Sequence, residues 1–278
     1  MTRPSPVLGE RYRRALVDAA QWHETQTRKG STVPYVSHVL AVSSAVMEDG
    51  GDEDECIAAL LHDAVEDCGI SRATIAQRFG ERVADIVMAC TDDTGGDRDN
   101  KAPWWSRKVH HIEHLSRFAA AGDLGVIRVT AADKLSNLRS TLDDPQDSVF
   151  SIFKAGLGGF AWYHATFCGM LVDALRVAPG SANTSGTPRS SILAVRLENA
   201  LGELAALTDR YRERYAPVVE QMLTELSSEE MLVPTGRHDP LPWFVLDVAH
   251  RAGGSATWRD HVAAARAGWF AQPLTMSD

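Results

Sequence analysis

The sequence predicts an all-α protein, and three observations lead to this class. Apolar residues recur at helical spacing through most of the chain, and no run alternates for long with the two-residue period of a strand. Residues typical of helix ends separate these apolar stretches. Hydrophobic residues make up 44% and charged residues 23% of the 278 positions, which is ordinary for a globular protein.

The first 178 residues are predicted to form one domain of successive helices. Helices are expected over residues 9–27, 38–49, 54–68, 72–79, 82–90, 104–120, 124–142 and 149–177. Ser37 is the expected N-cap of the second helix. Residues 91–103 contain glycines and aspartates and are expected to form a loop. Residues 126–130 are the one run in which strand and helix compete.

Residues 179–190 are the clearest linker, because the segment PGSANTSGTPRS lacks large apolar side chains. It divides the domain at residues 1–178 from a C-terminal helical extension at residues 191–278. Helices in the extension are expected over residues 192–215, 217–226 and 257–267, around a stretch that contains prolines. No motif indicates what the extension does.

The net charge of −9 argues against general binding to nucleic acid or to an anionic membrane. The N-terminus has no apolar signal segment, and no later run approaches the length of a membrane span. We therefore expect a soluble, cytoplasmic protein that acts on a small molecule. The four cysteines lack paired CxxC spacing and are expected to be reduced thiols. Homo-oligomerisation is left open.

The chemistry is expected in the segment LLHDAVED at residues 60–67. In a helix, Glu66 lies one turn beyond His62, and Asp67 lies one turn beyond Asp63. The apolar residues before them place the pair beside the core, where a histidine and an aspartate without partners would cost several kcal/mol. A metal ion would supply the missing partner. Because adjacent helical side chains diverge by about 100°, His62 and Asp63 can both reach one ion only if the helix end faces a cavity. Two further ligands must then come from elsewhere.

Two other segments supply suitable groups. The segment RKGSTVPYVSH at residues 28–38 joins two cations in a turn to a histidine at the start of a helix. The segment ADKLSNLR at residues 132–139 places Asp133 and Asn137 on one helix face.

Together these motifs, RK…PYxxH, LLHDxxED and ADKLxNL in this order, resemble the HD-domain hydrolases of the RelA/SpoT type, and most closely their small stand-alone alarmone hydrolases. The resemblance covers residues 10–177. It implies an HD-domain helical bundle that hydrolyses the 3′-pyrophosphate of guanosine tetra- or pentaphosphate (ppGpp or pppGpp) to GDP or GTP and pyrophosphate.

The resemblance also implies a role for individual residues. One divalent metal ion, typically Mn²⁺ in this family, would be bound by His38, His62, Asp63 and Asp133. Two imidazoles and two carboxylates suit an octahedral ion with open positions. By similarity, Glu66 and Asp67 would orient and deprotonate the attacking water.

The nucleotide contacts are implied in the same way. Arg28 and Lys29 would hold the nucleotide, with a hydrogen bond added by Ser31. Asn137 matches the residue that holds the ribose. Lys134 would neutralise phosphate, although a plain surface cation explains it equally well.

Alternatives remain open at this stage. Val39 replaces the usual proline, the turn at residues 28–35 differs in detail, and the loop at residues 91–103 is acidic. The same machinery could therefore act on another phosphorylated nucleotide such as NADPH, or the domain could sense a nucleotide without catalysis. His110, His111 and His114 form an HHxxH pattern without the glutamate of HExxH, and we interpret them as a polar helix face.

Overall fold

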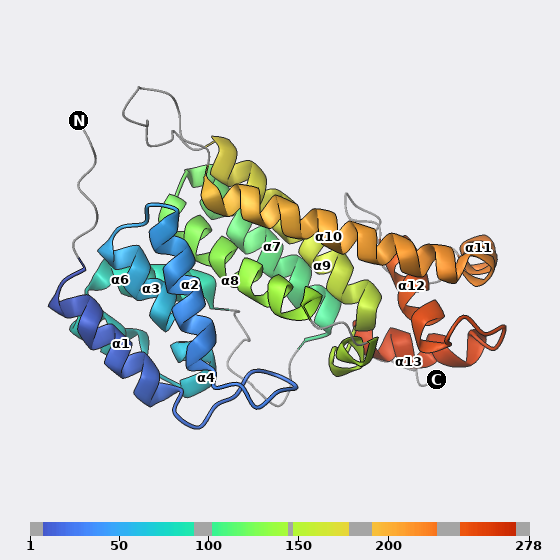
Figure 1. The fold of residues 1–278 in the computed structure, drawn as a ribbon, viewed down its shortest axis with the longest axis horizontal. Helices are drawn as coiled ribbons and strands as arrows, with labels where there is room; N and C mark the ends of the chain where they lie inside the picture. The colour runs from blue at the N-terminus through green and yellow to red at the C-terminus, as the bar shows by residue number, and fades with distance from the viewer. Residues whose placement is uncertain (1–7, 92–101, 144–146, 178–190, 227–239, 271–278) are drawn as a thin grey trace, which may run out of the picture. The chain divides into compact units, whose positions relative to one another are not determined.

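The computed structural model describes residues 8–91, 102–143, 147–177, 191–226 and 240–270, and it confirms the all-α class (Figure 1). The helices are α1 (Glu10–Trp22), α2 (Val36–Glu48), α3 (Glu53–Leu61), α4 (Ala64–Cys68), α5 (Arg72–Phe79), α6 (Glu81–Cys90), α7 (Trp104–Ala121), α8 (Leu124–Leu142), the 3₁₀ helix η1 (Asp147–Ile152), α9 (Gly156–Val177), α10 (Ile192–Arg214), α11 (Ala216–Glu225), α12 (Leu241–Arg251) and α13 (Arg259–Trp269). Among the described residues, β pairing is limited to one bridge between Thr27 and Pro34.

The chain divides into two compact units. The first comprises Met1–Asp93, His111–Asp143 and Cys168–Ala200, and the second comprises Thr94–His110, Asp144–Phe167 and Leu201–Asp278. These units do not follow chain order, since α7, α9 and α10 each contribute residues to both. The predicted linker at residues 179–190 and most of the predicted loop at residues 91–103 lie outside the described residues.

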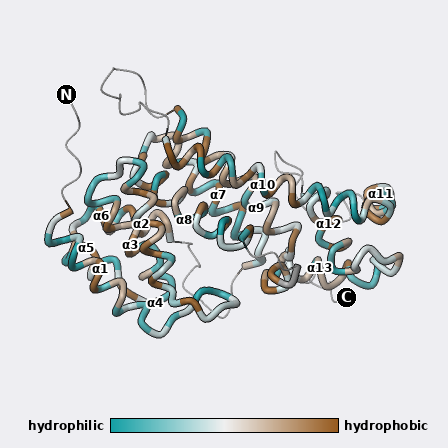
Figure 2. Tube along the Cα trace, viewed as in Figure 1, coloured by the Kyte–Doolittle hydropathy of each residue, from teal (hydrophilic) through white to brown (hydrophobic). Residues whose placement is uncertain are grey.

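Helix α3 is the centre of the first unit. It packs against α1, α2, α6 and α8. All six residues from Cys56 to Leu61 are fully buried, and this stretch is strongly hydrophobic (Figure 2). A capping box starts the helix, because the Asp52 side chain accepts from the Glu55 amide while the Glu55 side chain reaches back to the Asp52 amide. Because α3 is buried, its orientation is fixed, and so is the position of His62 and Asp63, which follow its C-terminal end.

The start of α2 differs from the prediction. Ser37 was expected to be the N-cap, but this is wrong because Tyr35 occupies that position and the Ser37 hydroxyl donates to the Pro34 carbonyl at 2.8 Å. The backbone therefore enters the helix two residues earlier. His38 consequently lies within the first turn of α2, where its position is held by the helix.

A carboxylate from the end of α2 caps α10. Asp49 Oδ1 accepts from the Ser191 hydroxyl at 2.7 Å and from the Leu193 amide at 3.1 Å. Its other oxygen accepts from Arg128 Nε at 2.9 Å. The start of α10 is thus attached to α2 and α8, all within the first unit.

Helices α8 and α12 differ in how well the sequence predicted them. Residues 126–130, for which strand competed with helix, are helical within α8. Helix α12 was not predicted, because its prolines suggested a break, yet Pro242 lies in the first turn, where the missing amide proton has no helical acceptor. None of the described helices is long and apolar enough to span a membrane.

Candidate metal centre

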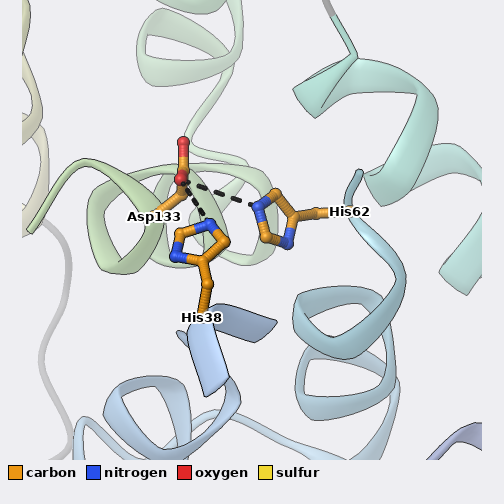
Figure 3. A group of neighbouring side chains, drawn as sticks. All are labelled: His38, His62 and Asp133. Atoms are coloured by element: carbon orange, nitrogen blue, oxygen red, sulfur yellow. Dashed lines mark ion pairs between the residues drawn. The ribbon is translucent and has the colours of Figure 1, made fainter. Parts of the chain in front are cut away.

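Three elements of the first unit bring two histidines and two aspartates together. His38 comes from α2, His62 and Asp63 follow α3, and Asp133 comes from α8. His38 Nε2 lies 3.2 Å from Asp133 Oδ1 and 3.6 Å from Asp63 Oδ2. His62 Nε2 lies 2.9 Å from Asp63 Oδ2 and 3.6 Å from Asp133 Oδ1. Both imidazoles point toward the Asp133 carboxylate (Figure 3).

An interruption of the helix between α3 and α4 allows the adjacent side chains of His62 and Asp63 to face the same point. The single helix predicted over residues 54–68 is wrong, because α3 ends at Leu61 and α4 begins at Ala64. At the junction Asp63 adopts φ −98° and ψ −2°, away from helical values. This local turn brings together two side chains that would diverge by about 100° on a continuous helix.

Hydrogen bonds orient both imidazole rings. His62 Nδ1 lies 2.9 Å from the carbonyl oxygen of Ala59, which can only accept, so Nδ1 carries the proton. His38 Nδ1 lies 2.9 Å from the Ser136 hydroxyl. The Nε2 atoms of both rings are buried and make no hydrogen bond. A histidine whose Nδ1 is engaged in this way presents Nε2 as a metal ligand.

The charges of the cluster are coupled. Burial opposes ionisation of Asp63, but His62 and His38 hold the pKa of this carboxyl well below its usual value. Burial likewise opposes ionisation of Asp133, and Lys134 and the two histidines lower its pKa. Burial would lower the pKa of His62, yet Asp63 and Asp133 raise it well above the ordinary value. Both carboxylates are therefore ionised at neutral pH, as metal ligands must be.

The donor set fits one divalent cation. Ligands about 2.0–2.2 Å from an ion lie roughly 3–3.6 Å from one another at octahedral or tetrahedral angles, and the nitrogen–oxygen separations fall between 2.9 and 3.6 Å. His38, His62 and Asp133 form a group that could hold a metal ion, with ligand atoms within 4.8 Å of one another. Two buried Nε2 atoms without hydrogen bonds are the atoms that such an ion would satisfy.

Three of the predicted nucleotide residues, Arg28, Lys134 and Asn137, are linked to this cluster. Arg28 Nη2 donates to Asn137 Oδ1 at 3.0 Å, and Asn137 Nδ2 donates to Asp133 Oδ1 at 2.6 Å. Lys134 Nζ lies 2.7 Å from Asp133 Oδ2. Lys134 is thus held against a carboxylate of the cluster, where it balances charge, and is not a plain surface cation.

Lys29 and Ser31 are exposed in the turn that carries Arg28. The turn is closed by a hydrogen bond from the Arg28 amide to the Val33 carbonyl at 2.8 Å. The Ser31 hydroxyl donates to the Arg28 carbonyl at 3.3 Å and accepts from the Val33 amide at 3.2 Å. Ser31 therefore stabilises the turn itself.

The two acidic residues after the cluster lie on α4. Asp67 is exposed, and its Oδ2 accepts a hydrogen bond from Gln26 Nε2 at 2.7 Å. Gln26 is held in turn by His23, whose Nδ1 lies 2.7 Å from Gln26 Oε1. Glu66 is half-buried.

The sequence missed three residues that support the site, namely Gln26, Tyr35 and Ser136. Tyr35 donates to Asp63 Oδ2 at 2.5 Å. Burial and the nearby Asp63 raise the pKa of the Tyr35 phenol above its ordinary value, so the hydroxyl keeps its proton. Tyr35 and Ser136 each lie within one turn of a predicted ligand, a spacing that many other hydroxyl residues share, so the sequence did not single them out. Gln26 had no local signal, because its partner Asp67 is 41 residues away.

The HHxxH residues do not form part of this centre. His111 is buried, so the interpretation as a purely polar face is wrong for that residue. In the described part of the chain, a cluster with metal-ligand geometry is found at His38, His62 and Asp133.

A family model described as "HD domain" matches residues 15–157, about half of the chain, and this match includes the whole cluster. The chain belongs to the HD domain family.

Two relatives of this HD domain protein are both named as 3′-pyrophosphohydrolases. It is 39% identical over 132 residues to a probable guanosine-3′,5′-bis(diphosphate) 3′-pyrophosphohydrolase of Synechocystis, covering 47% of this chain and 16% of that protein. It is 37% identical over 124 residues to the guanosine-3′,5′-bis(diphosphate) 3′-pyrophosphohydrolase MESH1 of Xenopus tropicalis, covering 44% of this chain and 64% of that protein. The chain thus spans less than two thirds of either relative.

A solved structure has a similar fold. It is that of a metazoan ortholog of SpoT described as hydrolysing ppGpp, and it shares 27% sequence identity with this HD domain protein at a TM-score of 0.50. The similarity covers 73% of this chain and 98% of that one.

Proposed function

We propose that this HD domain protein is a metal-dependent phosphohydrolase that removes the 3′-pyrophosphate of guanosine tetra- or pentaphosphate. The observation that carries the proposal is the convergence of His38 Nε2 and His62 Nε2, both buried without a hydrogen bond, on the carboxylates of Asp63 and Asp133. One ion, with Mn²⁺ as the proposed metal, would be held by these four residues.

The substrate class is supported by the relatives. Proteins named guanosine-3′,5′-bis(diphosphate) 3′-pyrophosphohydrolases align with 47–49% of this chain, at 33–39% identity in three bacterial cases. The residues beside the cluster also suit a nucleotide, because Arg28, Lys29 and Lys134 provide positive charge within an otherwise acidic chain.

The proposed reaction is hydrolysis at the 3′-phosphorus. A divalent ion at this centre would neutralise charge on the phosphate oxygens and lower the pKa of water. Glu66 and Asp67 orient the attacking water and accept its proton. The bond between phosphorus and the ribose 3′-oxygen breaks, the 3′-oxygen takes up a proton, and GDP or GTP separates from pyrophosphate.

The other residues position the substrate. Arg28 stacks on the base through its planar guanidinium, and Lys29 contacts phosphate from the exposed turn. Asn137 hydrogen-bonds the ribose, and Ser31 keeps the turn in shape. Lys134 keeps Asp133 ionised and adds positive charge near the phosphates.

The test is pyrophosphate release from guanosine tetraphosphate by metal-free protein, with and without added Mn²⁺. Asp133→Asn keeps the shape of the side chain but removes its charge, and the exposed Asp173→Asn is the matched control. Mn²⁺-dependent release by the wild type and the control, lost in Asp133→Asn, supports the proposal. Release without metal, or release that survives Asp133→Asn, contradicts it. A parallel assay of phosphate release from NADPH detects the same chemistry on another nucleotide.

A further inference from the structure

Tyr35 contacts the cluster without belonging to its predicted ligands. Its hydroxyl donates a hydrogen bond to Asp63 Oδ2 at 2.5 Å. The same oxygen lies 2.9 Å from His62 Nε2 and 3.6 Å from His38 Nε2, so it is the carboxylate oxygen that faces both imidazoles. A carboxylate oxygen has two lone pairs and can accept the phenol while it faces a cation.

The Tyr35 ring is itself held in place from several sides. It stacks on His23 with ring centroids 4.9 Å apart and meets the edge of His38 at 5.4 Å. Its amide donates to the Gln26 carbonyl at 2.9 Å, and its carbonyl accepts from the His38 amide at 2.9 Å. The hydroxyl is therefore directed at Asp63 by ring packing and by hydrogen bonds of the Tyr35 backbone.

Asp63 needs such support more than the other proposed ligands. His62 is anchored by Ala59 and His38 by Ser136. Asp133 receives hydrogen bonds from Lys134 and Asn137. Asp63 lies at the break between α3 and α4, outside regular helix, and its side chain is 23% exposed.

We infer that Tyr35 is a positioning residue that orients Asp63 Oδ2 toward the proposed metal ion. The inference rests on the metal site proposed above. Residues that hydrogen-bond metal ligands set ligand orientation, and their loss typically lowers metal affinity about 10- to 100-fold. Tyr35 thus completes a set in which each of the four proposed ligands is held by its own partner.

The test measures Mn²⁺ affinity directly, from the electron paramagnetic resonance signal of free Mn²⁺ titrated into metal-free, full-length protein. Tyr35→Phe removes only the hydroxyl and keeps the ring that packs on His23 and His38. The matched control is Tyr12→Phe, which removes a buried hydroxyl that lies 3.0 Å from Ser43 Oγ, away from the cluster. We expect Tyr35→Phe to raise the Mn²⁺ dissociation constant about 10- to 100-fold and Tyr12→Phe to change it less than about twofold.

A double-mutant cycle with Asp63→Asn separates positioning from general structural support. If Tyr35 acts through Asp63, adding Tyr35→Phe to Asp63→Asn changes the affinity much less than in the wild-type background. The same fold-change in both backgrounds, or an unchanged affinity in Tyr35→Phe alone, would overturn the inference. Circular dichroism of each variant without metal establishes that the fold is retained.

The binding measurement requires no substrate, so its outcome is independent of the reaction. Weakened Mn²⁺ binding in Tyr35→Phe without hydrolysis by the wild type would uphold the inference and refute the proposed activity. Mn²⁺-dependent hydrolysis by the wild type together with unchanged Mn²⁺ binding in Tyr35→Phe would support the proposed activity and refute the inference about Tyr35. Absence of Mn²⁺ binding by the wild type would overturn the proposed ion and the inference together.

Discussion

Arg28 Nη2 donates a hydrogen bond to Asn137 Oδ1 at 3.0 Å and joins two segments that lie 109 residues apart in the chain. Asn137 in turn donates to Asp133 at 2.6 Å. A continuous hydrogen-bonded path therefore runs from the exposed turn at residues 28–33 to a carboxylate of the metal centre. Arg28, proposed to bind nucleotide, and Asp133, proposed to bind metal, thus belong to one hydrogen-bonded framework.

The first prediction concerns Arg28. Arg28→Met keeps most of the side-chain length but removes the guanidinium, so the stacking on the base, worth about 2 kcal/mol where it is desolvated, is lost. We expect KM for guanosine tetraphosphate to rise at least about tenfold while kcat changes less than about threefold. Steady-state kinetics would check this, with the exposed Arg14→Met as control. A loss confined to kcat would contradict a binding role.

The second prediction concerns the hydrogen bond that Gln26 Nε2 donates to Asp67. Gln26→Met has a similar length but cannot donate, so Asp67 loses the contact that orients it. We expect kcat to fall about tenfold at saturating Mn²⁺, with Mn²⁺ affinity unchanged, because proton transfer depends on that orientation. Gln21→Met on α1 is an exposed control. If only Mn²⁺ affinity fell, Gln26 would serve the metal centre instead.

The third prediction concerns Asp49, which joins the start of α10 to α2 and α8. Its side chain is 3% exposed, and that of its partner Arg128 is 11% exposed. Asp49→Ala leaves Arg128 with one fewer carboxylate and removes the cap of α10, so the free energy of unfolding should fall by about 3 kcal/mol. Urea denaturation would measure the loss. Asp209→Ala, which removes an exposed ion pair with Arg212, should change it by less than about 1 kcal/mol.

The fourth prediction is a pH dependence in the second unit. Burial raises the pKa of Asp247 from 3.8 to about 6, although Arg251 and Trp269 donate to it. Because the folded protein binds this proton more tightly than the unfolded chain, the contribution of Asp247 to stability is greatest below pH 4 and declines as the pH rises through 6. A shift of about two pKa units corresponds to roughly 3 kcal/mol.

Urea denaturation of the wild type and of Asp247→Asn between pH 4 and pH 7 would test the sign. The wild type should lose stability relative to the variant over this range, since asparagine does not titrate. If the difference in the free energy of unfolding between wild type and variant stays constant, or grows in favour of the wild type, Asp247 does not bind its proton more tightly in the folded state.

Most helices could be predicted from the sequence because the spacing of apolar residues is a local property. The all-α class and the helices that carry His38 and Asp133 followed from such spacing. The break at residues 62–63 could not be predicted, because nothing between Asp54 and Cys68 disrupts a helical pattern. Glycine or proline would have indicated it, whereas here tertiary contacts decide the backbone. The cap that Asp49 provides for α10 was equally inaccessible, since its partner Ser191 lies 142 residues away.

The sequence predicted which residues form the candidate metal centre, but not how neighbouring groups orient them. The four proposed ligands lie together, but the partners that orient them had to be seen in space. Ser136 and Tyr35 are each within one turn of a ligand, yet the sequence contains many hydroxyl residues at such spacing. Lys134 had two competing interpretations; its Nζ lies 2.7 Å from Asp133 Oδ2, and its contact with phosphate stays a prediction.

The attachment of Ser191 to Asp49 also determines where this chain can be shortened. The family match ends at residue 157, and the predicted linker at residues 179–190 would suggest ending the chain near residue 178. Such a truncation would take away the hydroxyl and the amide that Asp49 accepts from, and would open the buried pair with Arg128 to water. Expression plasmids meant to isolate the metal centre should therefore extend beyond residue 200, because α7 and α9 also contribute residues to the second unit, which includes Leu201–Asp278.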